Sequence, residues 1–293
     1  MKKVLVLNSG SSSLKYQLFA VEGDNYDVLA KGLAECIGID GSKIKIKYAN
    51  GDKNEVEIDL PNHEIALREV FKLLLNGAIA DLHEIAAVGH RVVHGGEIFK
   101  ESALIDDKVL QQIDDLSSLA PLHNPAAVIG IKAVKNILPE VPQVATFDTA
   151  FHQTMPKEAF LYGLPMEQYE KHQIRRYGMH GTSHRYIAQE VEKLLGKGKK
   201  LIVCHLGNGA SLSAIKDGKC IDTSMGFTPL SGIVMGTRSG DIDPYIPLHI
   251  MKTQGLSIDE VNNLLNKQSG EYGLSGYPDM REVEDTYLEG REA

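Results

Sequence analysis

The segment VLVLNSGSSSLKYQLF, residues 4–19, sets the pattern for the whole chain. Residues 4–7 are all apolar, which predicts a buried strand. A polar turn of Asn, Gly and Ser residues follows, and from Leu14 onward apolar and polar residues alternate, which predicts a second strand. Small turn residues let a backbone approach a ligand closely, and several N–H and hydroxyl donors converge there. The tip of this hairpin therefore suits an oxyanion or a hydrated metal ion, and Lys15 adds a positive charge.

The same design returns about two hundred residues later in the chain. In LIVCHLGNGASLSAI, residues 201–215, an apolar strand runs into a turn rich in Gly, Asn and Ser, and a second strand follows. When Leu212 is aligned with Leu14, Ser211 falls on Ser13. A long internal repeat of this kind indicates a duplicated supersecondary unit. Two such hairpins, facing each other across a cleft, are predicted to bind a nucleotide at the domain interface.

Length and composition exclude several classes of protein. At 293 residues the chain is predicted to form two domains, since about 150 residues per domain is usual. The net charge of −8 argues against a nucleic-acid-binding surface. The three cysteines, an odd number without metal-binding spacing, argue against a disulfide framework. No apolar run approaches the roughly 20 residues of a membrane span, and the N-terminus lacks the apolar stretch of a signal peptide. The sequence predicts a soluble, cytoplasmic protein without a membrane or nucleic-acid partner.

Strands and helices alternate along the chain, which predicts α/β domains whose sites lie beyond the carboxyl ends of strands. We expect Asn124 to be the N-cap of a helix that carries Pro125 in its first turn. In the first unit, strands are expected at residues 27–33, 43–48, 55–60, 85–93 and 141–148, and helices at 65–75, 107–116 and 124–138. In a second unit, from about Phe151, helices are expected at 183–195, 257–267 and from 279, with a glycine-rich loop at 269–277.

Three further motifs accompany the duplicated hairpin: HRVVHGG at residues 90–96, FDTAFH at 147–152 and RRYGMHGTSH at 175–184. Together with the hairpins they resemble the acetate kinases, a family of the sugar-kinase/actin-like superfamily, over the whole length of the chain. The resemblance implies an α/β fold of duplicated actin-like, RNase H-like domains with a cleft between them. It implies a first domain at residues 1–150 that carries acyl-substrate residues, and a nucleotide-binding second domain at residues 151–293.

The activity implied by this resemblance is the reversible, direct in-line transfer of a phosphoryl group from ATP to acetate, which gives ADP and acetyl phosphate. Such a transfer asks a protein mainly for positioning and for positive charge around the oxygens of the moving group. The resemblance also implies Mg²⁺ as the metal, with Mn²⁺ as an alternative ion, and a homodimer.

Residues that match the family's nucleotide and metal sites come from both halves of the chain. Asn8 matches an asparagine that helps to hold Mg²⁺. Lys15 matches a lysine that contacts ATP, with a solvated strand charge as the alternative interpretation. Asp279 matches a stretch that lines the adenosine site, although an aspartate before a helix is also a common N-cap. The residues implied to bind nucleotide are Lys15, His205, Leu206, Gly207, Asn208, Gly209, Asp279, Met280 and Arg281.

A second group matches the family's acyl-substrate pocket. Arg91 follows a predicted strand and matches a carboxylate-binding arginine, and its planar guanidinium suits a carboxylate or a phosphoryl group. His123 matches a histidine near the same pocket, or it orients the loop before Pro125. Met179 stands where many members carry Phe, and its flexible side chain favours acceptance of propionate. The apolar walls of the pocket are implied at Val93, Leu122 and Pro229.

Three residues match catalytic positions: Asp148, His180 and Arg238. Arg238, in GTRSGD at residues 236–241, matches a second arginine of the pocket, and His180 matches a histidine that donates a hydrogen bond to the transferring phosphoryl group. Asp148 matches the family's catalytic aspartate. Because acetate is already ionised at neutral pH and has no proton to lose, we expect Asp148 to hold a metal-bound water or to orient an arginine or histidine.

The chain also departs from the family pattern. Chains of the family continue past the equivalent of residue 293, with another glycine-rich nucleotide loop and a Mg²⁺-binding glutamate. If these 293 residues are the whole molecule, the second domain is expected to be incomplete, with weak or absent turnover and exposed apolar surface. Three alternatives stay open: a propionate or butyrate kinase, an exopolyphosphatase-like hydrolase, and a non-catalytic nucleotide-binding module.

Overall fold

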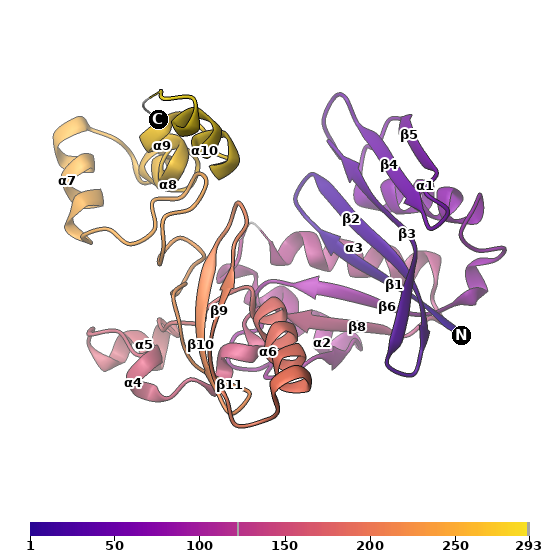
Figure 1. Cartoon of the computed structure of the whole chain (residues 1–293), viewed down its shortest axis with the longest axis horizontal. Coiled ribbons are helices and arrows are strands. Elements are labelled where there is room, and N and C mark those ends of the chain that lie inside the picture. The colour runs from indigo at the N-terminus through magenta and orange to yellow at the C-terminus, as the bar shows by residue number, and fades with distance from the viewer. Residues whose placement is uncertain (122, 292–293) are drawn as a thin grey trace. The chain divides into compact units, whose positions relative to one another are not determined.

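The computed structural model describes residues 1–121 and 123–291. The chain divides into two compact units, Met1–Ala150 and Phe151–Ala293 (Figure 1). Unit 1 is built on one large mixed sheet with helices, and unit 2 combines a small antiparallel sheet with several helices. Both units are therefore of mixed α/β character.

Unit 1 contains an eight-stranded sheet in the order β5-β4-β3-β2-β1-β6-β8-β7. Strands β1 to β5 are antiparallel neighbours, whereas β6 pairs in parallel with β1 and β8 pairs in parallel with β6. The carboxyl ends of β1, β6 and β8 therefore meet at one edge of the sheet. The strands are β1 (Lys2–Ser9), β2 (Ser13–Glu22), β3 (Asn25–Glu35), β4 (Lys43–Tyr48), β5 (Lys53–Glu57), β6 (Ile85–Val92), β7 (Ala103–Leu104) and β8 (Gln143–Phe147).

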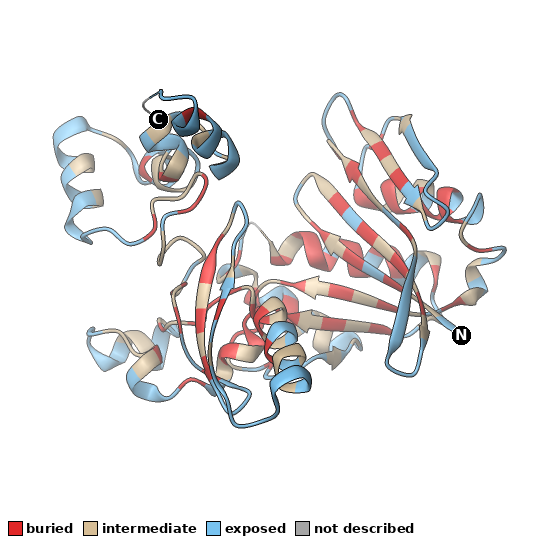
Figure 2. Cartoon of the chain, in the orientation of Figure 1, coloured by how far each residue is buried: buried red, intermediate tan, exposed pale blue. Residues whose placement is uncertain are grey.

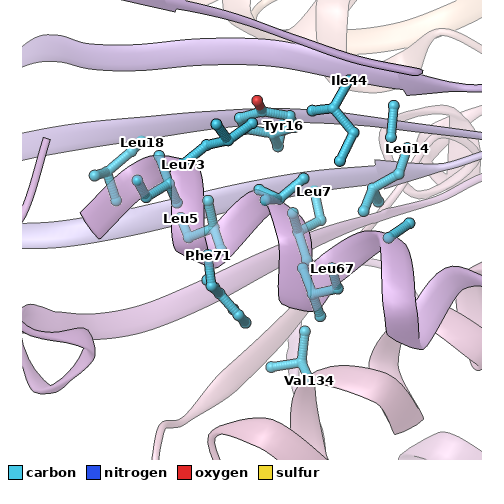
Figure 3. Close-up of a cluster of buried hydrophobic side chains, with 14 of the residues drawn as sticks. Leu5, Leu7, Leu14, Tyr16, Leu18, Ile44, Leu67, Phe71, Leu73 and Val134 are labelled. Atoms are coloured by element: carbon cyan, nitrogen blue, oxygen red, sulfur yellow. The ribbon is translucent and has the colours of Figure 1, made fainter. Parts of the chain in front are cut away.

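The helices of unit 1 pack on one face of this sheet. Side chains alternate between the two faces of a strand, and the buried positions of β1 and β2 alternate accordingly (Figure 2). Leu5 and Leu7 of β1 belong to the same buried cluster as Leu67 and Val134 from the helices (Figure 3). The other face carries polar side chains such as Lys15 and Gln17, and apolar ones such as the exposed Val6. The helices are α1 (His63–Leu75), α2 (Asp107–Asp115) and α3 (Asn124–Ile137), with short 3₁₀ turns η1 (Leu82–Glu84) and η2 (Leu116–Ser118).

The first hairpin is confirmed, with a tighter turn than expected. Its turn is limited to residues 10–12, because Asn8 and Ser9 belong to β1 and Ser13 belongs to β2. Asn8 is the direct cross-strand partner of Lys15. Directly opposed residues project from the same face of a sheet, so these two side chains are neighbours.

Neighbouring helices hold the tip of this hairpin. His63 Nε2 of α1 donates a hydrogen bond to the Gly10 carbonyl oxygen at 2.7 Å. Gly130 of α3 lies so close to the end of β1 that a Cβ atom on it would be 2.4 Å from Ser9 Oγ. The turn is therefore fixed from both helices rather than left as a mobile surface loop.

The expected cap of α3 is wrong. Asn124 is the first residue of the helix, and His123 occupies the N-cap position without a side-chain cap hydrogen bond. The Asn124 side chain is buried and instead brackets the backbone of His94: Oδ1 accepts from the His94 N–H at 3.1 Å and Nδ2 donates to the His94 carbonyl oxygen at 3.0 Å. A buried amide needs partners for its donor and its acceptor, and this loop supplies both. Asn124 thus ties the start of α3 to the loop that follows β6.

Unit 2 contains the second hairpin. Strands β9 (Lys200–His205), β10 (Ser211–Lys216) and β11 (Lys219–Thr223) form an antiparallel sheet in the order β11-β10-β9. β10 begins at Ser211 as β2 begins at Ser13, which confirms that the strand–turn–strand design is repeated. Helix α6 (Gly181–Leu195) packs on this sheet, where Ala188, Val203 and Ile215 form a small buried cluster.

The remaining helices of unit 2 follow the sequence less closely. The capping box of Ser257 and Glu260 is confirmed at the start of α8. The glycine-rich loop expected at residues 269–277 is wrong in part, because α9 forms within it, and α7 was not expected at all. The helical segments not yet given are η3 (Ala150–Thr154), α4 (Lys157–Phe160), α5 (Met166–His172), α7 (Tyr245–Gln254), α8 (Ile258–Lys267), α9 (Gly270–Ser275) and α10 (Met280–Leu288).

Several large apolar side chains of unit 2 are exposed. Leu194, Ile202 and Leu206 are 81%, 68% and 75% exposed. β1 has a strand on each side, but among the described residues β9 pairs only with β10. Ile202 lies on this edge strand.

In the part of the chain that the structure describes, no helix has the length and apolar character needed to cross a membrane.

Candidate active site

In unit 1, candidate residues lie where the three parallel strands end. Asn8 is the penultimate residue of β1, Arg91 is the penultimate residue of β6, and Asp148 directly follows β8. Val6 pairs with Gly89 in parallel register, so the period of two places Asn8 and Arg91 on the same face. This face is opposite the one on which Leu5 and Leu7 pack against the helices. The structure therefore gathers these polar groups at the carboxyl edge of the sheet, where α/β proteins carry their sites.

Arg91 and Asp148 form a bidentate ion pair. Arg91 Nη2 lies 2.6 Å from Asp148 Oδ2, and Nε donates to Oδ1 at 3.1 Å. Asp148 is only 1% exposed, whereas 39% of the Arg91 side chain is exposed. Burial by itself lowers the pKa of Arg91, but the charge and hydrogen bonds of Asp148 outweigh it and raise this pKa above its ordinary value. The arginine is held charged and oriented, with part of its guanidinium open to a ligand.

This contact separates the two roles expected for Asp148. Both carboxylate oxygens are engaged by one guanidinium, and the group is buried. A carboxylate that holds a metal-bound water needs an accessible oxygen. The geometry therefore favours the orienting role over the metal-water role.

Buried neutral histidines support the strand that carries Arg91. His90 Nε2 and Gln143 Oε1 are hydrogen-bonded at 2.7 Å, which joins β6 to β8. Burial lowers the pKa of His90 to about 4, and it lowers the pKa of His94 to about 4 as well. His94 Nδ1 accepts from the Gly96 N–H at 3.1 Å. These histidines have structural contacts that fix the end of β6 and the loop after it.

The other candidates of unit 1 are placed around this edge. Asn8 is half-buried, and Lys15 across the hairpin from it is exposed. Val93 and His123 are both half-buried. Val93 directly precedes His94 and His123 directly precedes Asn124, and the Asn124 side chain is hydrogen-bonded to the His94 backbone. Leu122 lies outside the described residues.

In unit 2, candidate residues converge on Gly209 in the turn of the second hairpin. A Cβ atom at Gly209 would lie 3.2 Å from Arg238 Nη1 and 3.5 Å from His180 Nε2. Arg238 Nη1 also donates to the Pro229 carbonyl oxygen at 3.1 Å, and burial lowers the pKa of Arg238 below its ordinary value. His180 is the N-cap of α6 and has a left-handed backbone with φ of 62°. Segments far apart in the sequence thus bring a guanidinium and an imidazole to one glycine.

A cluster of histidines lies next to Gly209 and Arg238. The rings of His180 and His205 stack with centroids 4.1 Å apart. His180 Nδ1 lies 2.9 Å from Ser211 Oγ, and His184 Nε2 lies 2.8 Å from the same oxygen. Sequence reasoning missed Ser211 and His184 as site residues. The available signals were the alignment of Ser211 with Ser13 and the place of His184 at the end of the RRYGMHGTSH motif.

A pocket of about 720 Å³ lies beside the second hairpin. Gly236 allows the walls of this pocket to pack closely. A Cβ atom on Gly236 would be 2.5 Å from Asn208 Oδ1 and 2.6 Å from the Pro278 carbonyl oxygen. The size suits a small-molecule ligand. Its lining residues, which join the hairpin to the start of α10, are Leu206, Gly207, Asn208, Ala210, Ile233, Val234, Met235, Glu271, Pro278, Asp279, Met280 and Arg281.

Asp279 is an N-cap in this structure. Its Oδ1 accepts from the Arg281 N–H at 3.0 Å, and its carboxylate forms an ion pair with the Arg281 side chain. Hydrogen bonds from Arg281 lower the pKa of Asp279 to about 2. The capping role is therefore confirmed, and Asp279 also lines the pocket.

No group of three or more His, Cys, Asp or Glu side chains in residues 1–121 and 123–291 is arranged to hold a metal ion by itself. A smaller pocket of about 240 Å³ near Gln143, at the amino end of β8, contains none of the candidate residues. The candidates instead fall into two sets, one in each unit. The set in unit 1 is Asn8, Lys15, Arg91, Val93, His123 and Asp148, and the set in unit 2 is His180, His205 to Gly209, Pro229, Arg238 and Asp279 to Arg281.

Comparison with known proteins gives consistent results. A model described as the acetokinase family matches residues 3–293. The acetate kinases of Thermotoga petrophila and Thermotoga maritima are each 57% identical to the chain over 298 aligned residues, and the match covers 99% of this chain and 73% of each relative. The acetate kinase of Lachnoclostridium phytofermentans is 56% identical and is covered to 74%.

Solved structures of the same kind superpose closely. The crystal structure of Porphyromonas gingivalis acetate kinase matches with a TM-score of 0.94 and 46% identity. That of a propionate kinase from Francisella tularensis subsp. tularensis SCHU S4 matches with a TM-score of 0.93 and 46% identity. Both matches cover 99% of this chain and 74% of the solved chain.

Proposed function

The chain belongs to the acetokinase family, and from that we propose that it transfers a phosphoryl group reversibly between ATP and acetate. It is an enzyme of the phosphotransferase class with a carboxylate as the acceptor. A carboxylate oxygen attacks the γ-phosphorus of ATP, the bond from that phosphorus to the bridging oxygen breaks, and ADP leaves with the electron pair. The attacking carboxylate carries no proton, so the step needs no general base.

The observation that carries this proposal is the convergence at Gly209. Arg238 and His180 lie beside the turn of a small-residue hairpin, within reach of one point. Donors and positive charge placed around a transferring phosphoryl group supply most of the catalysis in such reactions. Arg238 would neutralise the charge on this group, and His180 would donate a hydrogen bond to it.

The acyl substrate is assigned to unit 1. Arg91 presents an oriented, partly exposed guanidinium, and a guanidinium binds a carboxylate in a fixed plane. We assign Asp148 the positioning of Arg91. Val93, Leu122 and His123 are the residues of this unit proposed to surround the acyl group.

ATP is assigned to unit 2, in the pocket between the second hairpin and the start of α10. His205 at the end of β9 and the turn residues Leu206 to Gly209 would bind phosphates, and Asp279 to Arg281 would line the adenosine site. Lys15 of unit 1 is proposed to contact the nucleotide as well.

A divalent ion fits the chain as a partner of the nucleotide phosphates. Mg²⁺ in kinases keeps several waters and takes one or two protein oxygens together with substrate phosphates, so it needs no cluster of protein ligands. The half-buried amide of Asn8 is the proposed protein ligand. The bound ion would neutralise phosphate charge; Mn²⁺ is expected to substitute. A homodimer and a cytoplasmic location, both implied by the family, stay predictions.

Propionate is the second candidate substrate. The solved propionate kinase is as similar to this chain as the solved acetate kinase is. One methylene changes the free energy of binding by only about 1–3 kcal/mol, so both acids are expected to react at different rates.

The test is acyl phosphate formation by the 293-residue chain. Purified protein is incubated with ATP, MgCl₂ and acetate or propionate, and hydroxylamine traps any acyl phosphate as a hydroxamate. Hydroxamate that depends on the added carboxylate supports the proposal, and the ratio of the two rates gives the preference. Release of phosphate without hydroxamate would show a hydrolase. ATP binding without either product would show a nucleotide-binding module.

A further inference from the structure

His180 has two ring nitrogens in different surroundings. Nδ1 lies 2.9 Å from Ser211 Oγ, and Nε2 lies on the side of Gly209 and Arg238. A neutral imidazole carries one proton, so one nitrogen donates and the other accepts. Which nitrogen carries the proton therefore decides whether His180 offers a donor or an acceptor toward Gly209.

Ser211 decides this through a second histidine. Its hydroxyl has one hydrogen but contacts two imidazole nitrogens, Nδ1 of His180 and Nε2 of His184 at 2.8 Å. It can donate to only one of them. Its oxygen could accept from both, but the hydroxyl hydrogen would then be buried without an acceptor among the described residues, which is costly. Two arrangements use this hydrogen, and they give His180 opposite tautomers.

The surroundings of His184 select between these arrangements. His184 and Ser211 are both fully buried, and His184 Nδ1 has no hydrogen-bond partner among the described residues. Burial, with smaller contributions from the nearby His152 and His205, lowers the pKa of His184 to about 3, so His184 is neutral. If Ser211 donated to His184, the proton of that ring would sit on Nδ1 as a buried N–H without an acceptor. An orphaned N–H is the rarer and costlier defect in folded proteins than an unused acceptor.

We propose that Ser211 is a positioning residue that, backed by His184, fixes His180 in the tautomer with its proton on Nε2. His184 Nε2–H donates to Ser211 Oγ, and the Ser211 hydroxyl donates to His180 Nδ1. His180 Nε2–H then lies on the side of Gly209, from which it would donate to a phosphoryl oxygen. The last step rests on the proposed function, whereas the tautomer itself does not.

The test is the tautomer of His180, measured by ¹⁵N NMR on the full chain labelled at histidine, with the His180 signals assigned from His180→Asn. In the unaltered protein, a protonated Nε2 and an unprotonated Nδ1 are expected. A proton on Nδ1 would overturn the proposal without any further variant. Addition of MgATP is expected to shift the Nε2 signal; an unshifted signal with the expected tautomer would instead refute the proposed role of His180 in phosphoryl transfer.

Ser211→Ala is the decisive variant, and Ser213→Ala is its matched control. Ser213 is equally buried on the same strand but pairs with Thr223 Oγ1 at 3.0 Å. Ser211→Ala is expected to give a mixture of His180 tautomers, and Ser213→Ala to leave the tautomer unchanged. An unchanged tautomer in Ser211→Ala, or equal changes in both variants, would overturn the proposal.

A double-mutant cycle adds a kinetic readout. In the hydroxamate assay, Ser211→Ala is expected to lower kcat roughly tenfold, about the effect of one hydrogen bond, with little change in the KM for ATP. Combined with His180→Ala, it is expected to cause no further loss, since Ser211 acts through His180. Additive losses would contradict the positioning role.

Discussion

At the scale of single residues, the central feature is a charge held in place by a buried partner. Asp148 is almost fully buried and uses both oxygens on Arg91, while Arg91 keeps more than a third of its side chain exposed. A buried ion pair is costly to break, because the remaining charge loses its compensation. Asp148 is therefore best understood as the group that sets the plane of Arg91.

Asp148→Asn is expected to lower kcat/KM for acetate by about 10- to 100-fold, because the guanidinium loses its charged anchor while the side-chain volume is retained. The hydroxamate assay measures this. In an Arg91→Ala background, Asp148→Asn should lower kcat/KM for acetate hardly any further, as expected for a residue that acts through Arg91.

Asp107→Asn is the matched control, since Asp107 forms a single exposed ion pair with Lys135 at 2.6 Å. It should leave kcat/KM unchanged. Full activity of Asp148→Asn would refute the positioning role and any other essential role of Asp148.

The buried histidines of unit 1 predict how stability depends on pH. His90 and His94 have a pKa of about 4 when folded, below the ordinary value of 6.5. The unfolded chain therefore takes up protons that the folded chain refuses, so stability is complete above pH 6.5 and is lost as the pH falls from 6.5 towards 4. Each histidine is expected to remove roughly 3 kcal/mol from the free energy of unfolding over this range.

Urea denaturation at several pH values between 7 and 5 measures this slope. His90→Asn should flatten it, and the exposed His83→Asn should not. A slope that His90→Asn leaves unaltered would show that folding does not lower the pKa of His90.

At the scale of elements, glycines decide how closely the parts of the site approach. Gly130 lets α3 reach the end of β1, and Gly236 lets the second hairpin reach the residue before Asp279. In both places a Cβ atom would fall inside the contact distance of an oxygen atom. The positions of the hairpins therefore depend on small residues outside the hairpins themselves.

Gly236→Ala is expected to weaken ATP binding at least tenfold and to cost about 1–3 kcal/mol of stability. Its Cβ would lie 2.6 Å from the Pro278 carbonyl oxygen, so backbone must move and the pocket must change shape. Calorimetric titration with ATP and thermal unfolding measure the two effects.

Gly163→Ala is the control from the same unit, because a Cβ atom there would meet nothing within 4 Å. It should change neither quantity. Unaltered ATP affinity in Gly236→Ala would show that the pocket beside the second hairpin is not the nucleotide site.

At the scale of the whole molecule, the two units differ in how well they are buried. The main cluster of unit 1 joins residues from five strands with α1 and α3, whereas two clusters of unit 2, counted among the described residues, contain three buried residues each. Apolar burial is the dominant stabilising contribution in folding. Unit 2 also exposes large apolar side chains on β9 and α6, such as Ile202 and Leu194.

Hydrogen exchange of the full chain is therefore expected to show faster opening in unit 2 than in unit 1, with β1 and β6 among the slowest segments. Addition of MgATP should slow exchange around residues 206–210 and 279–281, since a ligand stabilises the state that binds it. Uniform exchange across both units would contradict the difference in burial.

Much of this architecture was predictable from local sequence patterns. Both hairpins, α1, α2, β6, β8 and α6 follow apolar periodicity and capping residues that act over a few positions. The exceptions have tertiary causes. Asn124 has the sequence of an N-cap, but the buried His94 backbone offers its amide two partners, and that contact prevails. α9 forms in a glycine-rich stretch whose backbone bonds to Met235 and Gly236, a dependence that no local pattern records.

The residue types of the site, and the family that carries them, were determined by the sequence alone, because motifs and repeats are local in the chain. The facing of the two hairpins across a cleft stays a prediction from that sequence. Only the folded structure shows that Asp148 forms an ion pair with Arg91 and that Ser211 is hydrogen-bonded to both His180 and His184. Such pairs join residues about 30 to 60 positions apart, and their chemistry depends on burial and on distances of about 3 Å, which exist only once the chain has packed.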